Sequence, residues 1–167
     1  MTRRDIIIQW LAYGVALAAI TILNFSVLSW LPISLPLLPP MAAVAAGTLE
    51  GPRFGAGYGL AAGLVMATIG HASPAAVPLL AALGWCCGML TQFVLRRDLV
   101  GHILCASAAM VLWELFQVLS RCLRGVASLQ VLLKVALPEL LWTLLFSLPI
   151  YWICRFCCLH YGRIYHE

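Results

Sequence analysis

Charged side chains are scarce in this sequence, and lysine is almost missing. Only 10% of the 167 residues are Asp, Glu, Lys or Arg, and a single lysine stands beside nine arginines. Soluble domains carry roughly 25% charged residues. Hydrophobic residues instead make up 63% of the chain, and the mean hydropathy is +1.00. The composition excludes a soluble domain and predicts an all-α integral membrane protein.

Long polar stretches are also lacking. The connections between the apolar runs are short, so they leave no room for a separate soluble domain, and we expect one transmembrane domain over residues 1–167. The formal net charge of +4 comes from basic residues in these connections, where such residues set the orientation of a membrane protein. We therefore expect membrane lipids and membrane proteins as partners, and no nucleic acid.

The seven cysteines do not form a disulfide framework. Their number is odd, and most lie within or at the ends of apolar runs, where cysteine acts as a small hydrophobic residue. The tail "CRFCCLHYGRIYH" (154–166) contains one C-x-x-C motif without a second pair of ligands, so we predict no metal site. Acylation of these membrane-proximal cysteines is an alternative role.

Groups that could carry out catalysis are equally sparse. The local spacing around His71 and His102 does not assemble a nucleophile, a base and an orienting acid. Cys86 and Cys87 lie in an apolar run, where thiols without a charged partner are inert. We predict a protein that is not an enzyme and that needs no cofactor.

Apolar runs of about 20 residues predict membrane-spanning helices. Six candidates occur, and they predict a compact six-helix bundle. They cover residues 6–28, 35–49, 52–69, 75–95, 99–119 and 138–157. The second is marginal, because Pro36, Pro39 and Pro40 in its first half should kink or unwind it. The first follows Arg3 and Arg4 without a clear signal cleavage site, so we expect it to be retained.

The last apolar stretch, residues 126–156, is too long for one upright span, and Pro138 divides it. We interpret residues 126–137 as an interfacial segment that precedes the sixth span. Proline suits the first turn of a helix, and the acidic Glu139 beside it favours the positive end of the helix dipole. One long kinked helix is the alternative.

The charges in the connections predict the orientation. With six spans, one side of the membrane collects seven arginines and the other side collects three basic residues. The first set is Arg3, Arg4, Arg53, Arg96, Arg97, Arg155 and Arg163, and the second is Arg121, Arg124 and Lys134. Because positively charged loops stay in the cytoplasm, we expect both termini there.

Four glycines follow one another at four-residue intervals in "EGPRFGAGYGLAAG" (50–63). Each such step turns by about 40° on a helix, so Gly51, Gly55, Gly59 and Gly63 form one slanting face. Small residues on a membrane helix let another backbone approach closely. The face predicts helix packing inside the bundle. Contact with another protein chain, self-association and a ligand site are the alternatives.

Ionisable residues at the centre of a bilayer cost about 2.5–3.5 kcal/mol, so they face the bundle interior or a partner. Glu114, Gln117 and Arg121 share one stripe of the fifth span. A structural hydrogen bond between helices is one interpretation of this stripe. Contact with a partner's membrane helix or with a small ligand is the other.

Two further polar pairs are candidates for partner contact. Glu50 and Arg53 flank the turn between the second and third spans, where they either set the topology or form a docking site. Glu139 and Thr143 lie one turn apart on the last span. For Glu139, capping of the helix start is the alternative to a functional role.

Three segments carry a resemblance to a known family. The run "EGPRFGAGYGLAAGLV" resembles the glycine-rich segment of MreD, the small membrane subunit of the bacterial cell-elongation machinery. "LWELFQVL", which contains Glu114, resembles the family's fifth span, and "LPELLWTLLFSLPIYWICR" resembles its final span. The length, the number of predicted spans and the order of these segments agree as well.

The resemblance implies a location and a function. A member of this family would lie in the bacterial cytoplasmic membrane as a non-catalytic scaffold. It would bind MreC and link the cytoskeletal protein MreB to the RodA glycosyltransferase and its penicillin-binding transpeptidase, in support of cell shape and peptidoglycan synthesis. The family's fold is similar to the S-component, the substrate-binding subunit of energy-coupling-factor vitamin transporters. Such a transporter subunit is the alternative function.

Overall fold

The computed structural model describes residues 3–27, 38–69, 74–95, 98–123, 125 and 129–161. These residues form helices joined by short turns, and no strand occurs in these ranges. Four helices are long and apolar enough to cross a membrane. They cover Ile6–Ser26, Ala76–Phe93, Leu99–Leu123 and Lys134–His160. The structure agrees with an all-α membrane protein, whereas the count of six spans stays a prediction.

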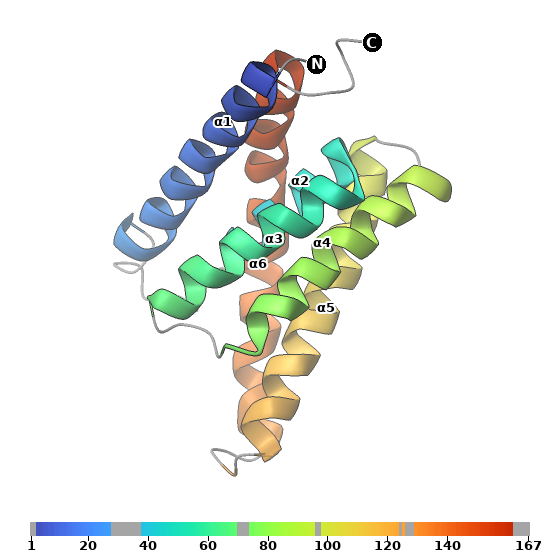
Figure 1. Cartoon of the computed structure of the whole chain (residues 1–167). Helices are drawn as coiled ribbons and strands as arrows, with labels where there is room; N and C mark the ends of the chain where they lie inside the picture. Colours follow the sequence, from blue (N-terminus) through green and yellow to red (C-terminus); the bar gives the residue numbers. More distant parts are fainter. Residues whose placement is uncertain are drawn as a thin grey trace.

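Six α-helices and one short π-helix follow one another in the described chain. They are α1 (Arg3–Ile22), η1 (Leu23–Val27), α2 (Leu38–Glu50), α3 (Pro52–Thr68), α4 (Ala76–Phe93), α5 (Leu99–Leu123) and α6 (Leu129–Tyr161). α1 begins and α6 ends at the same end of the bundle (Figure 1). We call this the terminal end and the opposite one the distal end.

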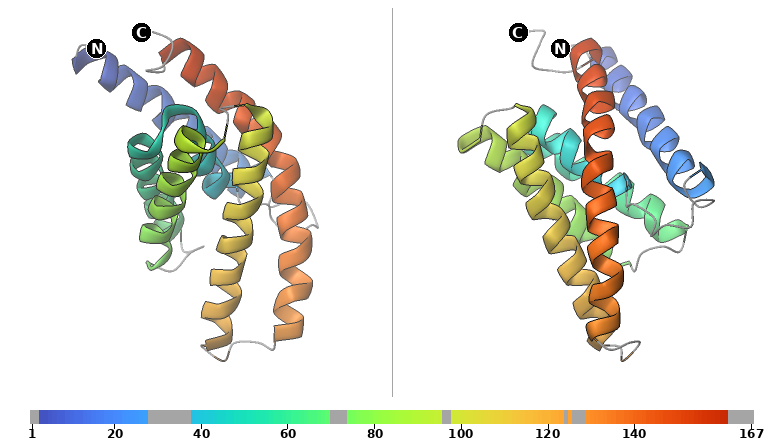
Figure 2. Two further views of the ribbon diagram at one scale, coloured as in Figure 1. Left: turned by 90° about the vertical axis from the view of Figure 1, so that its right-hand side faces the viewer. Right: turned by 180° about the vertical axis from the view of Figure 1, so that it is seen from behind.

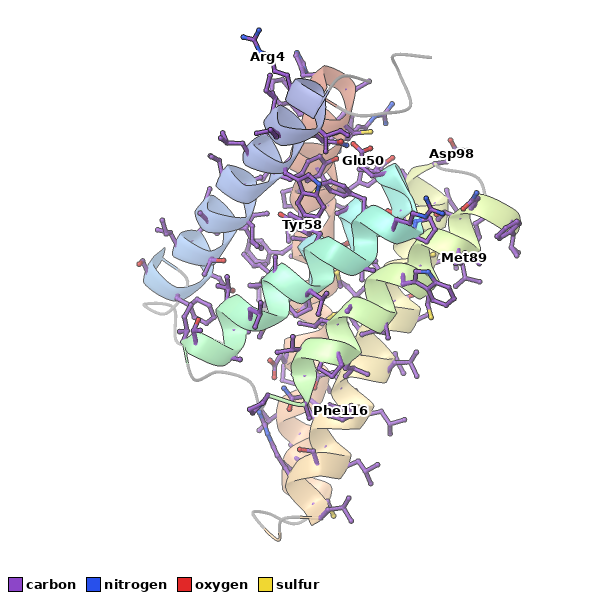
Figure 3. All side chains as sticks on the ribbon, viewed as in Figure 1. Arg4, Glu50, Tyr58, Met89, Asp98 and Phe116 are labelled. Atoms are coloured by element: carbon purple, nitrogen blue, oxygen red, sulfur yellow. The ribbon has the colours of Figure 1, made fainter. Side chains whose placement is uncertain are left out.

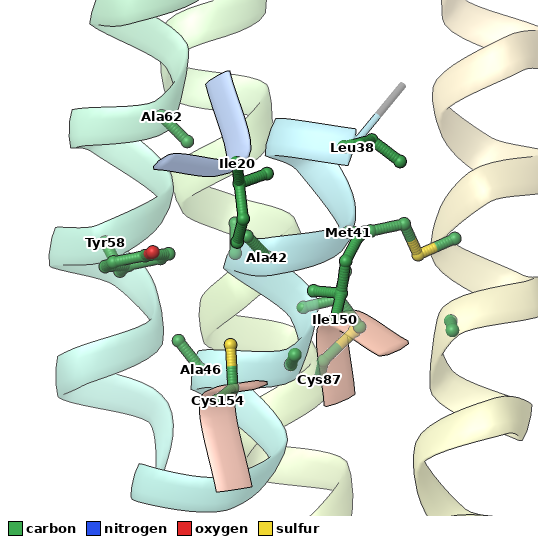
Figure 4. Close-up of a cluster of buried hydrophobic side chains, with 14 of the residues drawn as sticks. Ile20, Leu38, Met41, Ala42, Ala46, Tyr58, Ala62, Cys87, Ile150 and Cys154 are labelled. Atoms are coloured by element: carbon green, nitrogen blue, oxygen red, sulfur yellow. The ribbon is translucent and has the colours of Figure 1, made fainter. Parts of the chain in front are cut away.

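α2 is the centre of the bundle. Its residues from Leu38 to Leu49 are all buried, and it packs against α1, α3, α4, α5 and α6. Figure 4 shows Met41, Ala42 and Ala46 of this helix among side chains of its neighbours. With 13 residues it is only about 20 Å long, shorter than a hydrocarbon core of about 30 Å. The neighbouring helices therefore enclose it.

The two described prolines of the second predicted span do not unwind its helix. Pro39 and Pro40 lie in the first turn of α2, where the missing N–H groups cost no intrahelical hydrogen bond. The expected kink or unwinding at these two residues is therefore wrong. Pro36 lies outside the described residues.

The glycine face of α3 is buried inside the bundle. A Cβ atom on Gly55 would lie 2.5 Å from Cα of Gly47 in α2, and one on Gly63 would lie 2.8 Å from Cα of Val77 in α4. A Cβ on Gly59 would clash with the Leu80 backbone. Packing inside the bundle is therefore confirmed for these glycines. The close approach of α2 and α4 accounts for these glycines without a partner, and contact with a partner, a ligand or a second copy stays an untested alternative.

α6 is one continuous helix, with Pro138 and Pro149 in its interior. The predicted break at Pro138 is therefore wrong, and the alternative of one long helix is confirmed. The interfacial location of residues 126–137 stays a prediction, and residues 126–128 lie outside the described residues.

Neighbouring helices and Ser or Thr side chains let membrane helices tolerate proline. Thr143 and Ser147 donate to the carbonyl oxygens of Glu139 and Leu144, each at 2.6 Å. These are not the carbonyls of Lys134 and Leu145 that Pro138 and Pro149 leave without an i−4 partner, so the packing of neighbouring helices accounts for the continuous helix. The helix bends along its length (Figure 2), as prolines cause.

α5 and α6 form a hairpin that extends beyond the other helices at the distal end (Figures 1 and 2). The two helices pack against each other. α5 continues to Leu123, past the end of the predicted span at residue 119. The hairpin thus presents the distal parts of both helices to the surroundings.

Candidate functional site: polar clusters of the helix bundle

The residues predicted as contact sites fall into three places. The turn between α2 and α3 holds Glu50, Gly51 and Arg53. Glu50, labelled in Figure 3, lies toward the terminal end of the bundle. The core holds the three glycines of α3. The α5–α6 hairpin holds Glu114, Gln117, Glu139 and Thr143. The predicted polar residues therefore form two separate regions, one at the α2–α3 turn and one on the α5–α6 hairpin, and the glycines lie in the core.

Glu50 is held by a tyrosine of α1. The Tyr13 hydroxyl lies 3.0 Å from Oε1 of Glu50 and 3.3 Å from the carbonyl oxygen of Cys154. The Tyr58 hydroxyl donates to the Tyr13 carbonyl oxygen at 3.2 Å. Both tyrosines are almost completely buried. The cluster joins α1, α2, α3 and α6, and the packing of these four helices fixes the position of the Glu50 carboxylate.

The sequence analysis missed Tyr13 and Tyr58. Their hydrogen-bond partners lie 37 and 45 residues away, so no helical spacing connects them. A signal was nevertheless present, because a buried tyrosine in an apolar span needs a partner for its hydroxyl. Aromatic contacts extend the cluster, since the Phe54 ring lies 4.8 Å from Tyr13 and 4.5 Å from Trp10 between centroids.

A cavity of 490 Å³ opens beside Glu50. It is lined by Ile6, Gln9, Trp10, Glu50, Gly51, Pro52, Arg53, Phe54 and Gln92. Its shape depends on the turn between α2 and α3. Gly51 has a φ angle of 103°, which side-chain-bearing residues rarely adopt, and Pro52 takes the first position of α3. The cavity places two amides and two opposite charges beside aromatic rings.

Glu114 is buried near α6. Only 8% of the residue is exposed, and its Oε1 atom has no hydrogen-bond partner among the described residues. Glu139 of α6 and Arg121 of α5 lie close enough for their charges to act on it. Gln117 is half-buried and Arg121 is exposed, so burial decreases along the predicted stripe toward the end of α5.

Glu139 and Thr143 are joined through the backbone of α6. The Thr143 hydroxyl donates to the Glu139 carbonyl oxygen at 2.6 Å, and the Thr143 side chain is fully buried. Glu139 is half-buried. Its alternative role as a cap of the helix start is wrong, because α6 begins at Leu129. Two acidic side chains, one from each helix of the hairpin, therefore lie near one another.

A third polar cluster was missed by the sequence analysis. His102 of α5 is only 1% exposed, and its Nδ1 lies 3.3 Å from the Thr48 hydroxyl of α2. Its ring stacks on Tyr151 of α6 at 4.7 Å between centroids. Its Nε2 forms no hydrogen bond of good geometry with any of the described residues. Since Thr48 and His102 are 54 residues apart, no local motif connects them.

The described residues hold no group of three or more His, Cys, Asp or Glu side chains that could bind a metal ion. Cys154, Cys157 and Cys158 are buried in α6, and all the described cysteines are free thiols. The exposed His160 lies 3.0 Å from a carbonyl oxygen of its own helix. His166, the other histidine of the tail, lies outside the described residues.

Comparisons of the chain with protein-family models, curated proteins and solved structures found no match. The resemblance of three segments to MreD stays a prediction. The chemistry of the polar clusters is the basis for a function. Buried carboxyl groups in an apolar bundle form hydrogen bonds with donors on a neighbouring helix or a bound molecule.

Proposed function

We propose that this chain is a non-catalytic membrane subunit of the bacterial cell-elongation machinery, similar to MreD. In this role it binds an MreC-like protein and links MreB to a RodA-type glycosyltransferase and its penicillin-binding transpeptidase. The resemblance of residues 50–65, 112–119 and 137–155 to that family supports the proposal. The helical, membrane-type fold is compatible with it.

The Oε1 atom of Glu114, buried without a hydrogen-bond partner among the described residues, is the observation that carries the proposal. A buried polar atom without a hydrogen bond costs about 1–3 kcal/mol. Oε1 of Glu114 has no such bond in the described chain. An amide or basic side chain on a partner's membrane helix removes this cost. We infer that Glu114 is a contact for a partner helix that packs on the α5–α6 hairpin. Because Oε1 is enclosed in the described bundle, this contact requires the Glu114 side chain to rotate toward the partner when the partner binds.

The hairpin also has an apolar outer surface, on the faces of α5 and α6 that point away from Glu114 and Glu139. Exposed leucines lie on both of its members, at Leu112, Leu115, Leu119, Leu137 and Leu141. Apolar side chains alone do not distinguish a protein helix from lipid, because lipid tails are equally apolar. The leucines lie roughly 100–160° around their helices from Glu114 and Glu139. A partner that recognises the two acidic residues therefore approaches the seam between α5 and α6, and its specificity comes from these polar residues.

We further propose that six helices cross the bacterial cytoplasmic membrane with both termini in the cytoplasm. The excess of arginine in the connections on that side supports this orientation. The start of α1 and the end of α6 lie at the same end of the bundle, as an even number of crossings requires (Figure 1). The distal end of the hairpin then faces the exterior.

Affinity purification from native membranes tests the proposal. The tagged full-length chain should recover an MreC-like protein and wall-synthesis enzymes. Glu114→Leu should reduce this recovery about tenfold, because a hydrogen bond to a charged group contributes about 1.5–3 kcal/mol. Glu114→Gln keeps hydrogen-bonding capacity and should lose less.

The matched control lies on the same helix. The Ser107 hydroxyl bonds to the Leu104 carbonyl oxygen of α5 itself, so Ser107→Ala should leave recovery unchanged. Equal recovery by Glu114→Leu and the wild type would remove Glu114 from the interface. Recovery of paired ATPase subunits in place of wall-synthesis proteins would replace the proposed function with that of a vitamin-transporter S-component.

A further inference from the structure

A pair of cysteines lies buried between α4 and α5. Cys87 of α4 is only 4% exposed, and Cys105 of α5 is only 2% exposed. Figure 4 shows the Cys87 side chain within the cluster of buried hydrophobic residues. Neither cysteine lines the cavity beside Glu50, and neither belongs to the proposed contact at Glu114. The pair is therefore a separate feature of the bundle core.

The two cysteines face each other across the α4–α5 contact. The Sγ atom of Cys87 lies 3.9 Å from the carbonyl oxygen of Cys105, and the two thiol groups lie within hydrogen-bonding range of one another. Cys87 precedes the end of α4 at Phe93 by as many residues as Cys105 follows the start of α5 at Leu99. The turn between these helices therefore brings the two positions opposite one another.

The other described cysteines are arranged differently. Cys154, Cys157 and Cys158 share one helix, α6. On a helix, Cβ atoms three or four positions apart are separated by about 5–6 Å, and neighbours in sequence do not face each other. A disulfide needs a Cβ separation of about 3.5–4.5 Å. The remaining two, Cys86 and Cys122, are exposed. The pair between α4 and α5 thus combines burial, thiol contact and an origin in two helices.

An uncharged product suits this place in the core. A lasting thiolate brings charge into an apolar interior, which is costly, whereas a disulfide carries no charge. We propose that Cys87 and Cys105 are a modification site, at which a peroxide oxidises the two thiols to a disulfide that joins α4 to α5. The bond attaches the α5–α6 hairpin covalently to a helix that packs on α2 and α3.

Hydrogen peroxide supplies what the reaction needs. One sulfur attacks a peroxide oxygen, the O–O bond breaks, and the thiol proton joins the departing hydroxide, which gives a sulfenic acid and water. The second sulfur then attacks the sulfenic sulfur, the S–S bond forms, and the hydroxyl group leaves with the second thiol proton as water. Two thiols are oxidised to one disulfide, and one peroxide is reduced to two water molecules. The oxidant is small and uncharged, so it enters a core that excludes larger thiol reagents.

Mass spectrometry of the purified full-length chain tests this proposal. The folded chain is treated with hydrogen peroxide, denatured and alkylated with iodoacetamide. The wild type should lose the mass of two hydrogen atoms and protect two thiols from alkylation. Proteolysis should then release one pair of peptides joined through Cys87 and Cys105, and dithiothreitol should separate them. Cys87→Ala and Cys105→Ala should each abolish the joined pair.

The matched control is the neighbouring exposed thiol. Cys86→Ala should leave the joined pair unchanged, and a bulky maleimide should label Cys86 but not Cys87 in the folded, monodisperse wild type. Full alkylation of all seven cysteines after peroxide treatment would overturn the site. A sulfinic acid at Cys105 without joined peptides would show that the two sulfurs do not meet. Joined peptides that contain Cys86 in place of Cys87 would overturn the pairing.

Discussion

Gly55 of α3 and Gly84 of α4 lie backbone to backbone. A Cβ atom on Gly55 would lie 2.5 Å from the Gly84 carbonyl oxygen, closer than real Cβ atoms come to any heavy atom. A Cβ on Gly84 would clash with the Gly55 carbonyl oxygen in turn. Gly47 of α2 meets the same two residues. Three helices therefore converge at a point where only hydrogen atoms fit between the backbones.

Gly84→Ala should destabilise the bundle. The added methyl group meets backbone, which cannot rotate away, and overpacking of this kind costs about 1–3 kcal/mol. The apparent melting temperature of the purified chain in detergent should fall. Gly14→Ala is the matched control, because a Cβ at Gly14 of α1 has no heavy atom within 4 Å.

The control variant Gly14→Ala should not lower the melting temperature. Glycine inside a helix is less favourable than alanine by about 0.5–1 kcal/mol, so Gly14→Ala should leave the melting temperature unchanged or raise it slightly. A Gly84→Ala variant that is as stable as the wild type would disprove the close contact of α3 and α4.

Composition and small-residue spacing were enough to predict much of the bundle. The expected range 52–69 corresponds to α3 (Pro52–Thr68), because Pro52 and the glycine face are local signals. The burial of Gly55, Gly59 and Gly63 followed from the same spacing. The stripe of Glu114, Gln117 and Arg121 also depends on one helix only, and burial along it decreases as a single helical face implies.

The remaining features depend on contacts between distant segments, which a single sequence does not reveal. Whether Pro138 ends a helix depends on what packs beside it, and α5 runs along α6 there. The hydroxyl groups that bond to Glu50 and His102 come from Tyr13 and Thr48, which lie on other helices. The cavity beside Glu50 arises from three segments that meet only in the folded chain.

Thr48→Val should destabilise the chain through His102. Valine has the same shape but removes the hydroxyl partner of Nδ1, which leaves a buried polar atom with one bond fewer. Such a loss costs about 1–3 kcal/mol. Denaturation in detergent should show a lower midpoint than for the wild type.

A second substitution tests the cause of that loss. Combining Thr48→Val with His102→Phe removes both polar partners and keeps an aromatic ring on Tyr151, so part of the stability should return. Losses that simply add in the double variant would show that the hydroxyl and the ring are energetically independent.

Cys122 should be labelled from outside the cell. It is an exposed residue near the end of α5, at the distal end of the hairpin. In a chain whose other six cysteines are replaced, a membrane-impermeant maleimide should modify Cys122 in intact spheroplasts. Arg4→Cys, in a background without other cysteines, places a thiol at the exposed start of α1 and should react only after permeabilisation. The reverse pattern would invert the proposed orientation.

Glu114→Leu should have opposite effects on the isolated chain and on its assembly. In the isolated chain Oε1 of Glu114 is buried without a hydrogen-bond partner, so leucine removes a cost of about 1–3 kcal/mol. The purified variant should therefore unfold at a higher temperature than the wild type, while it recovers less partner from native membranes.

The direction of the change in stability, taken together with the direction of the change in partner recovery, distinguishes a contact residue from a structural one. If Glu114 mainly held α5 against α6, leucine would lower stability and partner recovery together. If Glu114 had no role, leucine would raise stability and leave recovery unchanged. Only a carboxyl group that is kept unpaired for a partner predicts a gain in stability together with a loss of recovery. Melting curves and quantified affinity purification of the same two proteins measure both signs.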